Sequence, residues 1–394
     1  MKIAITCPAS LPATQFGGIM FLCVNIARKI SDQGHEVTIY STDLDFANNP
    51  STFNKKLPRI EKVDNFYIKR THVWFFKFLF FINPRMYFQM MKDDIDVIHA
   101  VGIRSFQALI ATLVSKRKRI PLVISDQGGL TTHPELRQAS ILKKILIKFQ
   151  EPVIKYIIRN SDAVIVPNEY EKKIFLQFCE NEKIYIVRNG VDLEKLKISG
   201  FNFKKHYKIS TDFLLFLGRF HYVKGVDILL EAFKQIMGNP LLKNITLVIM
   251  GVDFGYEEKM NSIIQKLKIS EKVVVIKNPP REHVLAAYNE AEFLILPSRW
   301  ELSPLTPLEG FAFRKTVIST NTHGIPFTLE GNVNSLLVEN ESSKEVGDAI
   351  LELLRDKLKR DRLAESGYMF VKNIANSDNM VDGIFQIYNK VLNK

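Results

Sequence analysis

Short apolar runs alternate with amphipathic segments along the chain, and this rhythm predicts strands separated by helices. In the first half, β-branched runs that are each followed by a turn and a stretch of helical periodicity lie at residues 3–6, 36–40, 96–99, 122–125, 163–166 and 184–187. Continuous apolar runs of this length are typical of parallel strands that helices cover on both faces. The first half is therefore expected to fold as a doubly wound α/β domain.

The same rhythm restarts in the second half, which predicts a second domain of the same class. Its apolar runs lie at residues 213–217, 246–250, 273–277, 293–296, 316–319 and 336–338. Residues 196–211 are polar, rich in lysine and without clear periodicity, so we place the interdomain connection there. We predict one Rossmann-like domain over residues 1–200 and another over 201–376. The two domains would face a cleft that receives the carboxyl ends of their strands.

The composition limits the class of protein. With 394 residues, 46% hydrophobic and 11% aromatic residues and three cysteines, the chain is not disordered, disulfide-built or fibrous. The cysteines at 7, 23 and 179 are scattered without the spacing of a metal site, which favours a reducing compartment. Residues 1–6 are too few for the apolar region of a signal peptide, and charged residues interrupt the apolar stretch 73–91. We therefore expect a cytoplasmic protein without a membrane span.

The positive charge is concentrated in the first half. Residues 1–200 hold 29 Lys and Arg against 19 Asp and Glu, whereas residues 201–394 hold 25 against 23, within a formal charge of +12. Such a surface attracts nucleic acid, anionic lipid or a phosphorylated substrate, and charge alone does not choose among them. Compositional drift in a lysine-rich chain is the alternative explanation.

A loop with two cations follows the first predicted strand of the second domain. Arg219 and Lys224 lie five positions apart between Gly218 and Gly225, just before an amphipathic segment at 226–236. An arginine donates paired, planar hydrogen bonds to a phosphate, and a lysine supplies a point charge. The loop is thus a candidate for diphosphate binding, although two such cations alone are also typical of a solvated turn.

Two carboxylates follow a later predicted strand. Glu301 and Glu309 stand on either side of a predicted helix start, and Pro304 and Pro307 suit its opening turn. The free backbone N–H groups of that turn, at 305–306, would form an anion site, with the carboxylates placed to accept hydrogen bonds from sugar hydroxyls. Each glutamate alone also fits a structural role, Glu309 beside the helix N-terminus and Glu301 in solvent. Their joint spacing favours a site.

Together these segments resemble the retaining glycosyltransferases of family 4, which have the GT-B fold. The resemblance rests on residues 216–219 and 224–225, on 297–301 followed by Glu309, on the Asn-Gly-Val-Asp element at 189–192, and on Gly17-Gly18 after the first strand. It spans nearly the whole chain in the right order. It implies a metal-independent hexosyltransferase that has no cofactor and uses a UDP- or GDP-linked sugar as co-substrate for surface polysaccharide or glycan biosynthesis.

The resemblance also implies roles for individual residues. Arg219 and Lys224 would hold the donor diphosphate, Glu301 would hold the transferred sugar, and Glu309 would hold the ribose hydroxyls. The terminal helix, here 377–394, would return to the first, acceptor-binding domain. The implied catalytic residues are Glu301, Arg219, Lys224 and His99, and the implied donor contacts are Gly17, Gly18, Arg219, Lys224, Pro280, Glu301, Ser303, Leu305, Thr306 and Glu309.

The first domain departs from the family pattern at two places. The family often has a histidine two positions after His99, where this chain has Val101. His99 is therefore either the catalytic-site residue or a histidine at the end of a buried strand. Where a His-Gly pair is common after the next strand, the chain has Asp126 and Gln127. These two residues and His133 are candidates for contacts with the acceptor or the sugar.

The aromatic stretch at 73–91 bears on the acceptor. It interleaves eight aromatic residues with Lys77 and Arg85, and further cations follow at 116–119 and 143–148. A surface of this kind suits an anionic membrane, where the acceptor is a saccharide on a polyprenyl diphosphate or another lipid. We predict peripheral attachment to the inner face of the membrane. Burial of the aromatic side chains is the alternative.

Three other functions compete with this hypothesis. A nucleotide-sugar epimerase of GT-B fold shares the donor, but the four charged motif residues favour a transferase. A basic nucleic-acid-binding protein fits the pI near 9.3, yet no recognisable RNA or DNA motif is present. A dinucleotide oxidoreductase is disfavoured because no GxGxxG motif follows the first strand.

Overall fold

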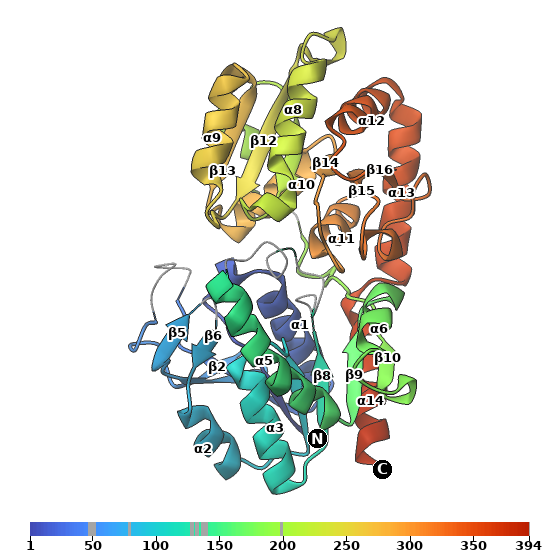
Figure 1. Cartoon of the computed structure of the whole chain (residues 1–394). Helices are drawn as coiled ribbons and strands as arrows, with labels where there is room; N and C mark the ends of the chain where they lie inside the picture. Colours follow the sequence, from blue (N-terminus) through green and yellow to red (C-terminus); the bar gives the residue numbers. More distant parts are fainter. Residues whose placement is uncertain are drawn as a thin grey trace. The chain divides into compact units, whose positions relative to one another are not determined.

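The computed structural model describes residues 1–45, 53–77, 80–126, 130, 134, 141–197 and 200–393. It divides the chain into two compact units (Figure 1). Unit 1 comprises Met1–Asn189 and the C-terminal segment that begins at Ser377, and unit 2 comprises Gly190–Asn376. No helix of the described residues is long and apolar enough to cross a bilayer.

The boundary between the units differs from the one at residue 200 that the sequence predicts. The expected connection at 196–211 falls inside unit 2, because Val191, Phe203 and Ile209 are buried in the core of that unit. The Val191 N–H also donates to the carbonyl of Ala375 (3.0 Å), near the other end of unit 2. A few widely spaced apolar residues therefore anchor a segment whose composition indicates a linker.

Unit 1 is built on an eight-stranded sheet with the strand order β10-β9-β8-β7-β1-β2-β4-β3. Paired strands are parallel except for β3 and β4. The six predicted strands are confirmed, whereas β3 and β4 were missed because their residues alternate between exposed and buried positions at the edge of the sheet. The strands are β1 (Lys2–Thr6), β2 (Glu36–Thr42), β3 (Ile60–Val63), β4 (Phe66–Thr71), β7 (Val97–Val101), β8 (Leu122–Ser125), β9 (Ala163–Val166) and β10 (Ile184–Ile186).

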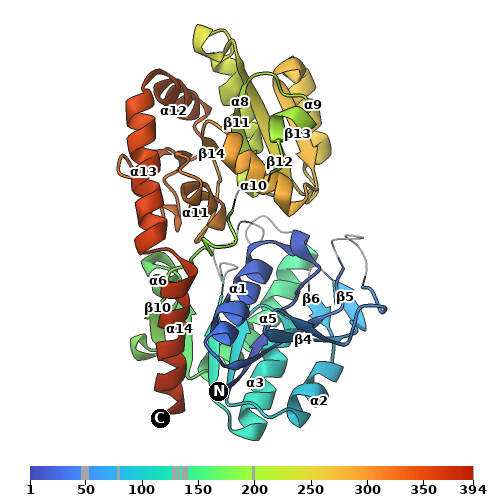
Figure 2. The ribbon, with the colours of Figure 1, turned by 180° about the vertical axis from the view of Figure 1, so that it is seen from behind.

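Helices cover both faces of this sheet (Figures 1 and 2). One core cluster joins Ile3 and Ile5 of β1 to α1 and α14, while Ala4 of the same strand packs in the opposite cluster with α2, α3 and α5. The terminal helix α14 thus completes the first core, where Tyr388 is fully buried. The helices are α1 (Gly18–Asp32), α2 (Arg85–Lys92), α3 (Phe106–Lys118), α5 (Ile141–Arg159), α6 (Glu169–Phe175) and α14 (Ser377–Leu392).

A small antiparallel hairpin accompanies the large sheet of unit 1. It consists of β5 (Phe75–Lys77) and β6 (Phe80–Ile82) and leads directly into α2. Short 3-10 helices occur in both units at η1 (Thr14–Phe16), η2 (Asn181–Lys183), η3 (Tyr222–Lys224), η4 (Pro240–Leu242), η5 (Ser270–Lys272) and η6 (Ile325–Phe327).

Unit 2 contains a six-stranded parallel sheet with the order β13-β12-β11-β14-β15-β16. All six predicted strands are confirmed. The chain builds outward from β11 to one side and then from β14 to the other, so the topological switch point lies between these two strands. The strands are β11 (Asp212–Leu217), β12 (Ile245–Gly251), β13 (Val273–Lys277), β14 (Leu294–Leu296), β15 (Val317–Thr320) and β16 (Ser335–Val338).

The helices of unit 2 follow its strands as the alternating pattern predicts. The helix predicted at 226–236 is confirmed as α8. Two core clusters hold the sheet between its helices. The helices are α7 (Phe203–His206), α8 (Val226–Ile236), α9 (Glu257–Lys266), α10 (Arg281–Glu290), α11 (Leu305–Ala312), α12 (Ser343–Arg355) and α13 (Lys357–Asn373).

Candidate functional site

The switch point of unit 2 brings the two charged motifs of the sequence together. β11 and β14 are neighbours in the sheet, with Leu215 opposite Leu294. The loop that carries Lys224 follows β11, and the loop that carries Glu301 follows β14. Because ligands of doubly wound sheets bind at the carboxyl ends of the strands beside a switch point, this junction is the candidate site.

Gly225 permits the close approach of the two loops. It has a φ of 66° at the start of α8, a left-handed conformation that favours glycine. A Cβ atom there would lie 1.9 Å from the carbonyl oxygen of Pro297, which no side chain allows. The Arg299 N–H donates to the Val223 carbonyl (2.8 Å) and joins the same loops. The glycine that ends the first motif is therefore required by packing against the second.

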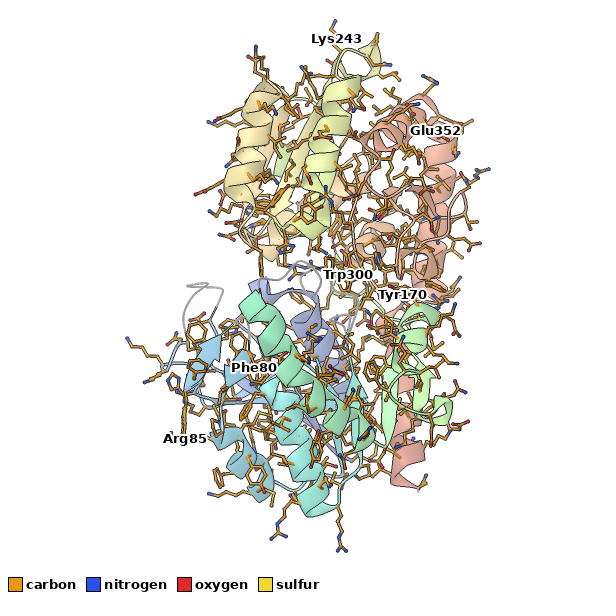
Figure 3. All side chains as sticks on the ribbon, viewed as in Figure 1. Phe80, Arg85, Tyr170, Lys243, Trp300 and Glu352 are labelled. Atoms are coloured by element: carbon orange, nitrogen blue, oxygen red, sulfur yellow. The ribbon has the colours of Figure 1, made fainter. Side chains whose placement is uncertain are left out.

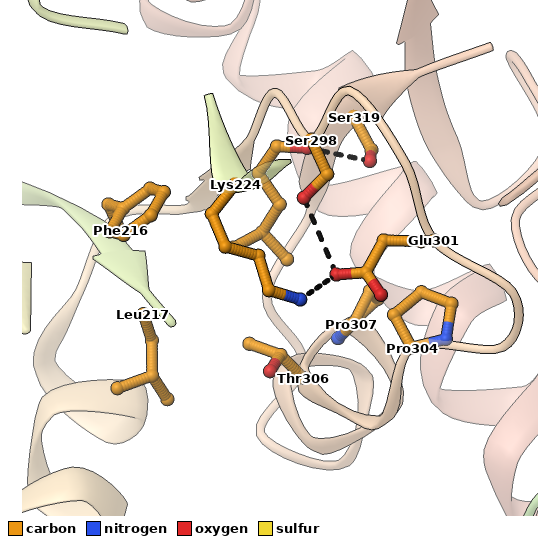
Figure 4. Close-up of a pocket in the computed structure, with 10 residues that line it drawn as sticks. Phe216, Leu217, Lys224, Ser298, Glu301, Pro304, Thr306, Pro307 and Ser319 are labelled. Atoms are coloured by element: carbon orange, nitrogen blue, oxygen red, sulfur yellow. Dashed lines mark hydrogen bonds and ion pairs between the residues drawn. The ribbon is translucent and has the colours of Figure 1, made fainter. Parts of the chain in front are cut away.

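Lys224 and Glu301 form an ion pair at this junction (Figure 4). Each side chain is 17% exposed, and the Ser298 hydroxyl also donates to the Glu301 carboxylate (3.4 Å). Burial lowers the pKa of Lys224, and the nearby Arg219 lowers it further, while Glu301 opposes both effects. The junction thus holds a cation in a poorly solvated place, where an additional negative charge interacts with it strongly.

A small pocket surrounds the ion pair. Its volume is about 20 Å³, room for about one water molecule. Figure 4 shows the amine of Lys224 and the carboxylate of Glu301 pointing toward each other, with Thr306 beside them. Three predicted donor residues therefore share one pocket. Its lining comprises Phe216, Leu217, Lys224, Leu296, Ser298, Glu301, Pro304, Thr306, Pro307 and Ser319.

The start of α11 lies where the sequence predicts it. Pro304 is the N-cap and Leu305 the first residue of the helix, with Ser303 immediately before them. The N–H groups of a first helical turn have no partner within the helix, and Pro304 supplies no side-chain cap. Pro304 and Thr306 line the pocket, so the positive end of the helix dipole faces it.

Glu309 lies one turn further along α11, and two side chains hold it. Nη1 and Nη2 of Arg281 donate to its Oε2 and Oε1 (3.0 and 2.6 Å), and the Tyr288 hydroxyl donates to Oε2 (2.9 Å). Burial raises the pKa of Tyr288 well above its ordinary value, and the Glu309 charge raises it further, so the phenol remains a donor. Pro280 is the N-cap of α10, which places this predicted residue directly before Arg281.

Sequence reasoning did not single out Arg281 or Tyr288. The two residues lie seven positions apart on α10, a spacing of about two turns that places them on one face of the helix. That spacing is visible in the sequence. Nothing in it identifies Glu309 of another helix as the shared partner, so only the packing of α10 against α11 reveals the group.

The two arginines of the motifs have different surroundings. Arg219 is partly exposed and lies over the ring of Phe254, with 5.0 Å between the guanidinium carbon and the ring centroid. Arg299 makes structural contacts, since it pairs in bidentate fashion with Asp227 (2.8 and 2.9 Å) and donates from Nε to Glu341 (2.7 Å). Arg219 therefore remains the candidate phosphate ligand, whereas Arg299 connects the loop that carries Glu301 to α8.

His99 has a structural position in place of the predicted catalytic one. It is 1% exposed, its Nδ1 lies 2.7 Å from the Tyr388 hydroxyl, and its Nε2 lies 3.0 Å from the Ser125 hydroxyl. Burial lowers its pKa to about 3, so the ring is neutral near pH 7. Because its two ring nitrogens contact the hydroxyls of Tyr388 on α14 and Ser125 on β8, His99 joins the terminal helix to the sheet.

The other predicted residues of unit 1 follow strand ends. Gly17 is the N-cap of α1, with a φ of 93°, and Gly18 is the first residue of that helix. A Cβ atom at Gly17 would meet nothing within 4 Å, so the backbone conformation and not crowding requires this glycine. Asp126 follows β8 and is 1% exposed. Gln127 and His133 lie outside the described residues.

A buried carboxyl group that the sequence did not reveal lies near Asp126. Glu171 of α6 is fully buried, and neither of its carboxylate oxygens has a hydrogen-bond partner among the described residues. Burial, and secondarily the charge of Asp126, raises the pKa of Glu171 well above its ordinary value. Burial at this position therefore favours the neutral, protonated form of the carboxyl over the charged form.

Comparison with known proteins identifies relatives of both halves of the chain. Residues 16–195 match the model of glycosyltransferase family 4, and residues 201–370 match the model of glycosyl transferases group 1. An uncharacterized glycosyltransferase of Methanocaldococcus jannaschii is 27% identical over 300 residues, which are 76% of this chain and 77% of that protein. The lipopolysaccharide 1,2-N-acetylglucosaminetransferase of Salmonella typhimurium is 26% identical over 262 residues, which are 63% of this chain and 68% of that enzyme.

Solved structures share the fold of the whole chain. Sucrose-phosphate synthase from Thermosynechococcus elongatus superposes with a TM-score of 0.77 at 17% identity, over 100% of this chain and 99% of that chain. HepE of Anabaena, solved with UDP and glucose, superposes with a TM-score of 0.76 at 17% identity, over 99% of each chain. At such low identity the likeness shows the fold alone, and it confirms the predicted GT-B class.

Proposed function

The chain belongs to the group 1 glycosyltransferases, and on that premise we propose that it moves a sugar from a nucleotide-sugar donor to a saccharide acceptor with retention at the anomeric carbon. The observation that carries the proposal is the junction of Lys224, Glu301 and the start of α11 at the switch point of unit 2. A cation, a carboxylate and a helix N-terminus around one pocket match the diphosphate and the hydroxyl groups of such a donor.

In the proposed complex the donor exchanges partners with the ion pair. The pocket of about 20 Å³ holds no more than a water molecule while Lys224 and Glu301 contact each other. The diphosphate binds at Lys224, Arg219 and the N–H groups of Leu305 and Thr306. It then replaces Glu301 as the ionic partner of Lys224. The Glu301 carboxylate is then available to accept hydrogen bonds from the transferred sugar.

Glu309 is the proposed binding site for the ribose, and here too the ligand replaces an existing contact. A carboxylate offers about four lone-pair positions, and Arg281 and Tyr288 together occupy three positions of Glu309. Two ribose hydroxyls therefore need the Arg281 side chain to yield at least one position. Its side chain is 41% exposed, which leaves it room to move. HepE was solved with UDP and with UDP-glucose, which supports a uridine nucleotide as the first donor to test, with GDP-sugars second.

The proposed chemistry needs stabilisation of a leaving group. When the bond between the anomeric carbon and the phosphate oxygen breaks, the electron pair stays on the diphosphate and the sugar gains oxocarbenium character. Lys224, Arg219 and the dipole of α11 stabilise the growing negative charge without rearrangement. For retention, the acceptor hydroxyl attacks from the face that the diphosphate leaves, and a donor phosphate oxygen takes its proton. Glu301 then serves as a hydrogen-bond acceptor and not as the nucleophile of a double displacement.

We assign the acceptor to a saccharide on a lipid carrier, with the enzyme bound peripherally at the cytoplasmic face of a membrane. The name of the Salmonella relative describes an enzyme of lipopolysaccharide, which supports a lipid-linked acceptor. The first half of the chain is positively charged, with 29 cationic against 19 anionic residues up to residue 200. This charge supports an anionic membrane surface as the partner of that half.

A panel of UDP-, GDP- and dTDP-sugars tests the proposal through release of nucleoside diphosphate and through thermal stabilisation. At least one nucleotide should bind saturably, and Glu309→Ala should weaken that binding roughly tenfold, the loss of one charge-assisted contact. Product analysis separates the alternatives, because a transferase forms a new glycosidic bond whereas an epimerase returns an epimerised sugar. Preferential binding of duplex DNA would favour a nucleic-acid-binding protein. Donor hydrolysis that Glu301→Ala and Arg219→Ala leave unchanged would reject the site.

A further inference from the structure

The hairpin of unit 1 presents aromatic rings to solvent. Trp74, Phe75 and Phe76 are 63%, 58% and 53% exposed, and Phe88 on the following helix α2 is 64% exposed. These four residues are the aromatic surface of unit 1. The sequence left open whether the stretch 73–91 is buried or exposed, and the structure divides it, since Phe81 of the same hairpin is 3% exposed. Neighbouring exposed rings of this size mark an interaction surface.

A small core behind the hairpin holds the exposed rings in place. Phe81 packs there against Phe53 (5.4 Å between ring centroids), and Phe53 also contacts Phe76 (5.0 Å). The backbone N–H of Trp74 donates to the carbonyl of Ile82 (2.8 Å), which closes the base of the hairpin. Burial of the inner residues thus fixes which rings face outward, so the exposure of the aromatic surface follows from packing.

The charges around the aromatic surface are positive at the exterior. Lys55 and Lys56 are exposed in the turn after Phe53, and neither forms an ion pair with a described residue. Arg85 is exposed at the start of α2, three residues after β6, and Figure 3 shows it at the outer edge of the unit. The two carboxylates that precede these lysines, Asp43 and Asp45, are both buried and hydrogen-bonded to neighbouring side chains. Lys55, Lys56 and Arg85 therefore place exposed cations on the segments that flank the aromatic hairpin.

We propose that the aromatic surface, together with Lys55, Lys56 and Arg85, docks unit 1 onto a bilayer that contains anionic lipids. Aromatic rings favour the headgroup level of a membrane, and nearby cations attract acidic headgroups. The charge complementarity favours an anionic lipid surface over a second copy of this basic chain. The docking itself is argued from the surface alone. Only its role, to bring the enzyme to a lipid-linked acceptor, rests on the proposed function.

The tryptophans make the test direct, because the chain has two and they differ in exposure. Trp74 is 63% exposed on the hairpin, whereas Trp300 is 6% exposed in unit 2. In full-length Trp300→Phe, Trp74 is the single indole. Vesicles of phosphatidylcholine with phosphatidylglycerol should shift its emission to shorter wavelength, and acyl-brominated lipids should quench it. Vesicles of phosphatidylcholine alone should shift and quench the Trp74 emission much less. In Trp74→Phe, the remaining indole should report neither change.

Sedimentation with the same vesicles measures the contribution of each group. The variant Trp74→Ser/Phe75→Ser/Phe76→Ser should bind at least tenfold more weakly, since insertion of even one of the three rings contributes roughly a factor of ten. Lys55→Glu/Lys56→Glu should lose about fivefold or more for each removed cation, and its binding should depend less on salt. Leu358→Ser is the matched control, because Leu358 is an 84% exposed apolar residue of unit 2.

The outcomes separate this proposal from its rivals. Vesicle binding that the triple variant retains, or Trp74 emission that anionic vesicles leave unchanged, overturns it. A dimer in light scattering that the triple variant abolishes, without vesicle binding by the wild type, assigns the surface to a second copy and also overturns it. Nucleotide-induced thermal stabilisation is measured for each variant without vesicles. Normal stabilisation together with lost vesicle binding supports the docking surface and distinguishes it from failure of the donor site.

Discussion

The Lys224 amine and the Glu301 carboxylate are ion-paired at the switch point of unit 2, although 77 positions separate them in the chain. The adjacency of β11 and β14 creates this pair, and Gly225 lets the two loops touch. Each group satisfies the charge of the other in a poorly solvated pocket. A ligand that separates the pair must therefore compensate both groups. A diphosphate supplies negative charge to Lys224, and sugar hydroxyls supply hydrogen-bond donors to the Glu301 carboxylate.

Removal of the Lys224 charge should impair the chemical step. Lys224→Ala is expected to lower kcat by about 10²–10³, the range found when one preorganised donor to a developing anion is lost. Lys224→Arg should recover part of this loss because it keeps the charge. Steady-state hydrolysis or transfer with the best donor measures the effect. Lys234→Ala, which removes an exposed cation of α8, is the control, and an unchanged kcat in Lys224→Ala would contradict the assignment.

Arg281 should act on donor binding through Glu309. Arg281 gives up one of its two hydrogen bonds to Glu309 when the ribose binds, and the other still orients the carboxylate. Arg281→Ala removes this orientation, so we expect a KM for the donor about tenfold higher and a kcat within about twofold of the wild type. Arg281→Lys should restore part of the affinity. Lys277→Ala, at another exposed ion pair of unit 2, should change neither constant. An equal fall in kcat and kcat/KM for Arg281→Ala would instead indicate a role in the transition state.

His99 should matter for stability and not for catalysis. His99→Phe keeps a ring in the core but leaves the hydroxyls of Tyr388 and Ser125 without this partner. The free energy of unfolding is expected to fall by about 1–3 kcal/mol, the cost of an unsatisfied buried polar group. Chemical denaturation measures it. The kcat at a temperature where the variant is folded should stay within about twofold, and a much larger fall would restore the catalytic role.

Glu171 should make the protein less stable as the pH rises. Its pKa in the folded state is raised from an ordinary value of 4.5, so the folded state binds this proton more tightly than the unfolded state does. The stability that protonated Glu171 contributes is complete below pH 4.5 and is lost as the pH rises toward the folded pKa. Glu171→Gln should therefore gain stability relative to the wild type with increasing pH above 4.5.

Unfolding by denaturant across this pH range provides the measurement for Glu171. Glu169→Gln is the matched control for the loss of one carboxylate from the same helix, since Glu169 is its exposed first residue. A difference between Glu171→Gln and wild type that is constant with pH would show that the native carboxyl does not carry a raised pKa.

The regular elements were largely predictable, because parallel strands covered on both faces need continuous apolar runs. All twelve predicted strands occur, and α8 has the predicted bounds. Half-exposed strands such as β3 carry alternating residues and were missed. The unit boundary was also misplaced, because Val191 and Phe203 enter the second core from a segment of polar composition. A periodic pattern reports that a face is apolar, but it does not report which core receives isolated apolar residues.

The sequence by itself determined the doubly wound class and the family. It also identified Lys224, Glu301 and Glu309 as charged groups that follow strands, because each of these features depends on a local pattern of neighbouring residues. Only the tertiary structure decided the partners: Arg281 and Tyr288 for Glu309, Tyr388 for His99, and an exterior position for Trp74. Hydrogen bonding, burial and pKa depend on atoms that packing brings together from distant parts of the chain. Local pattern specifies the groups, and packing specifies what surrounds them.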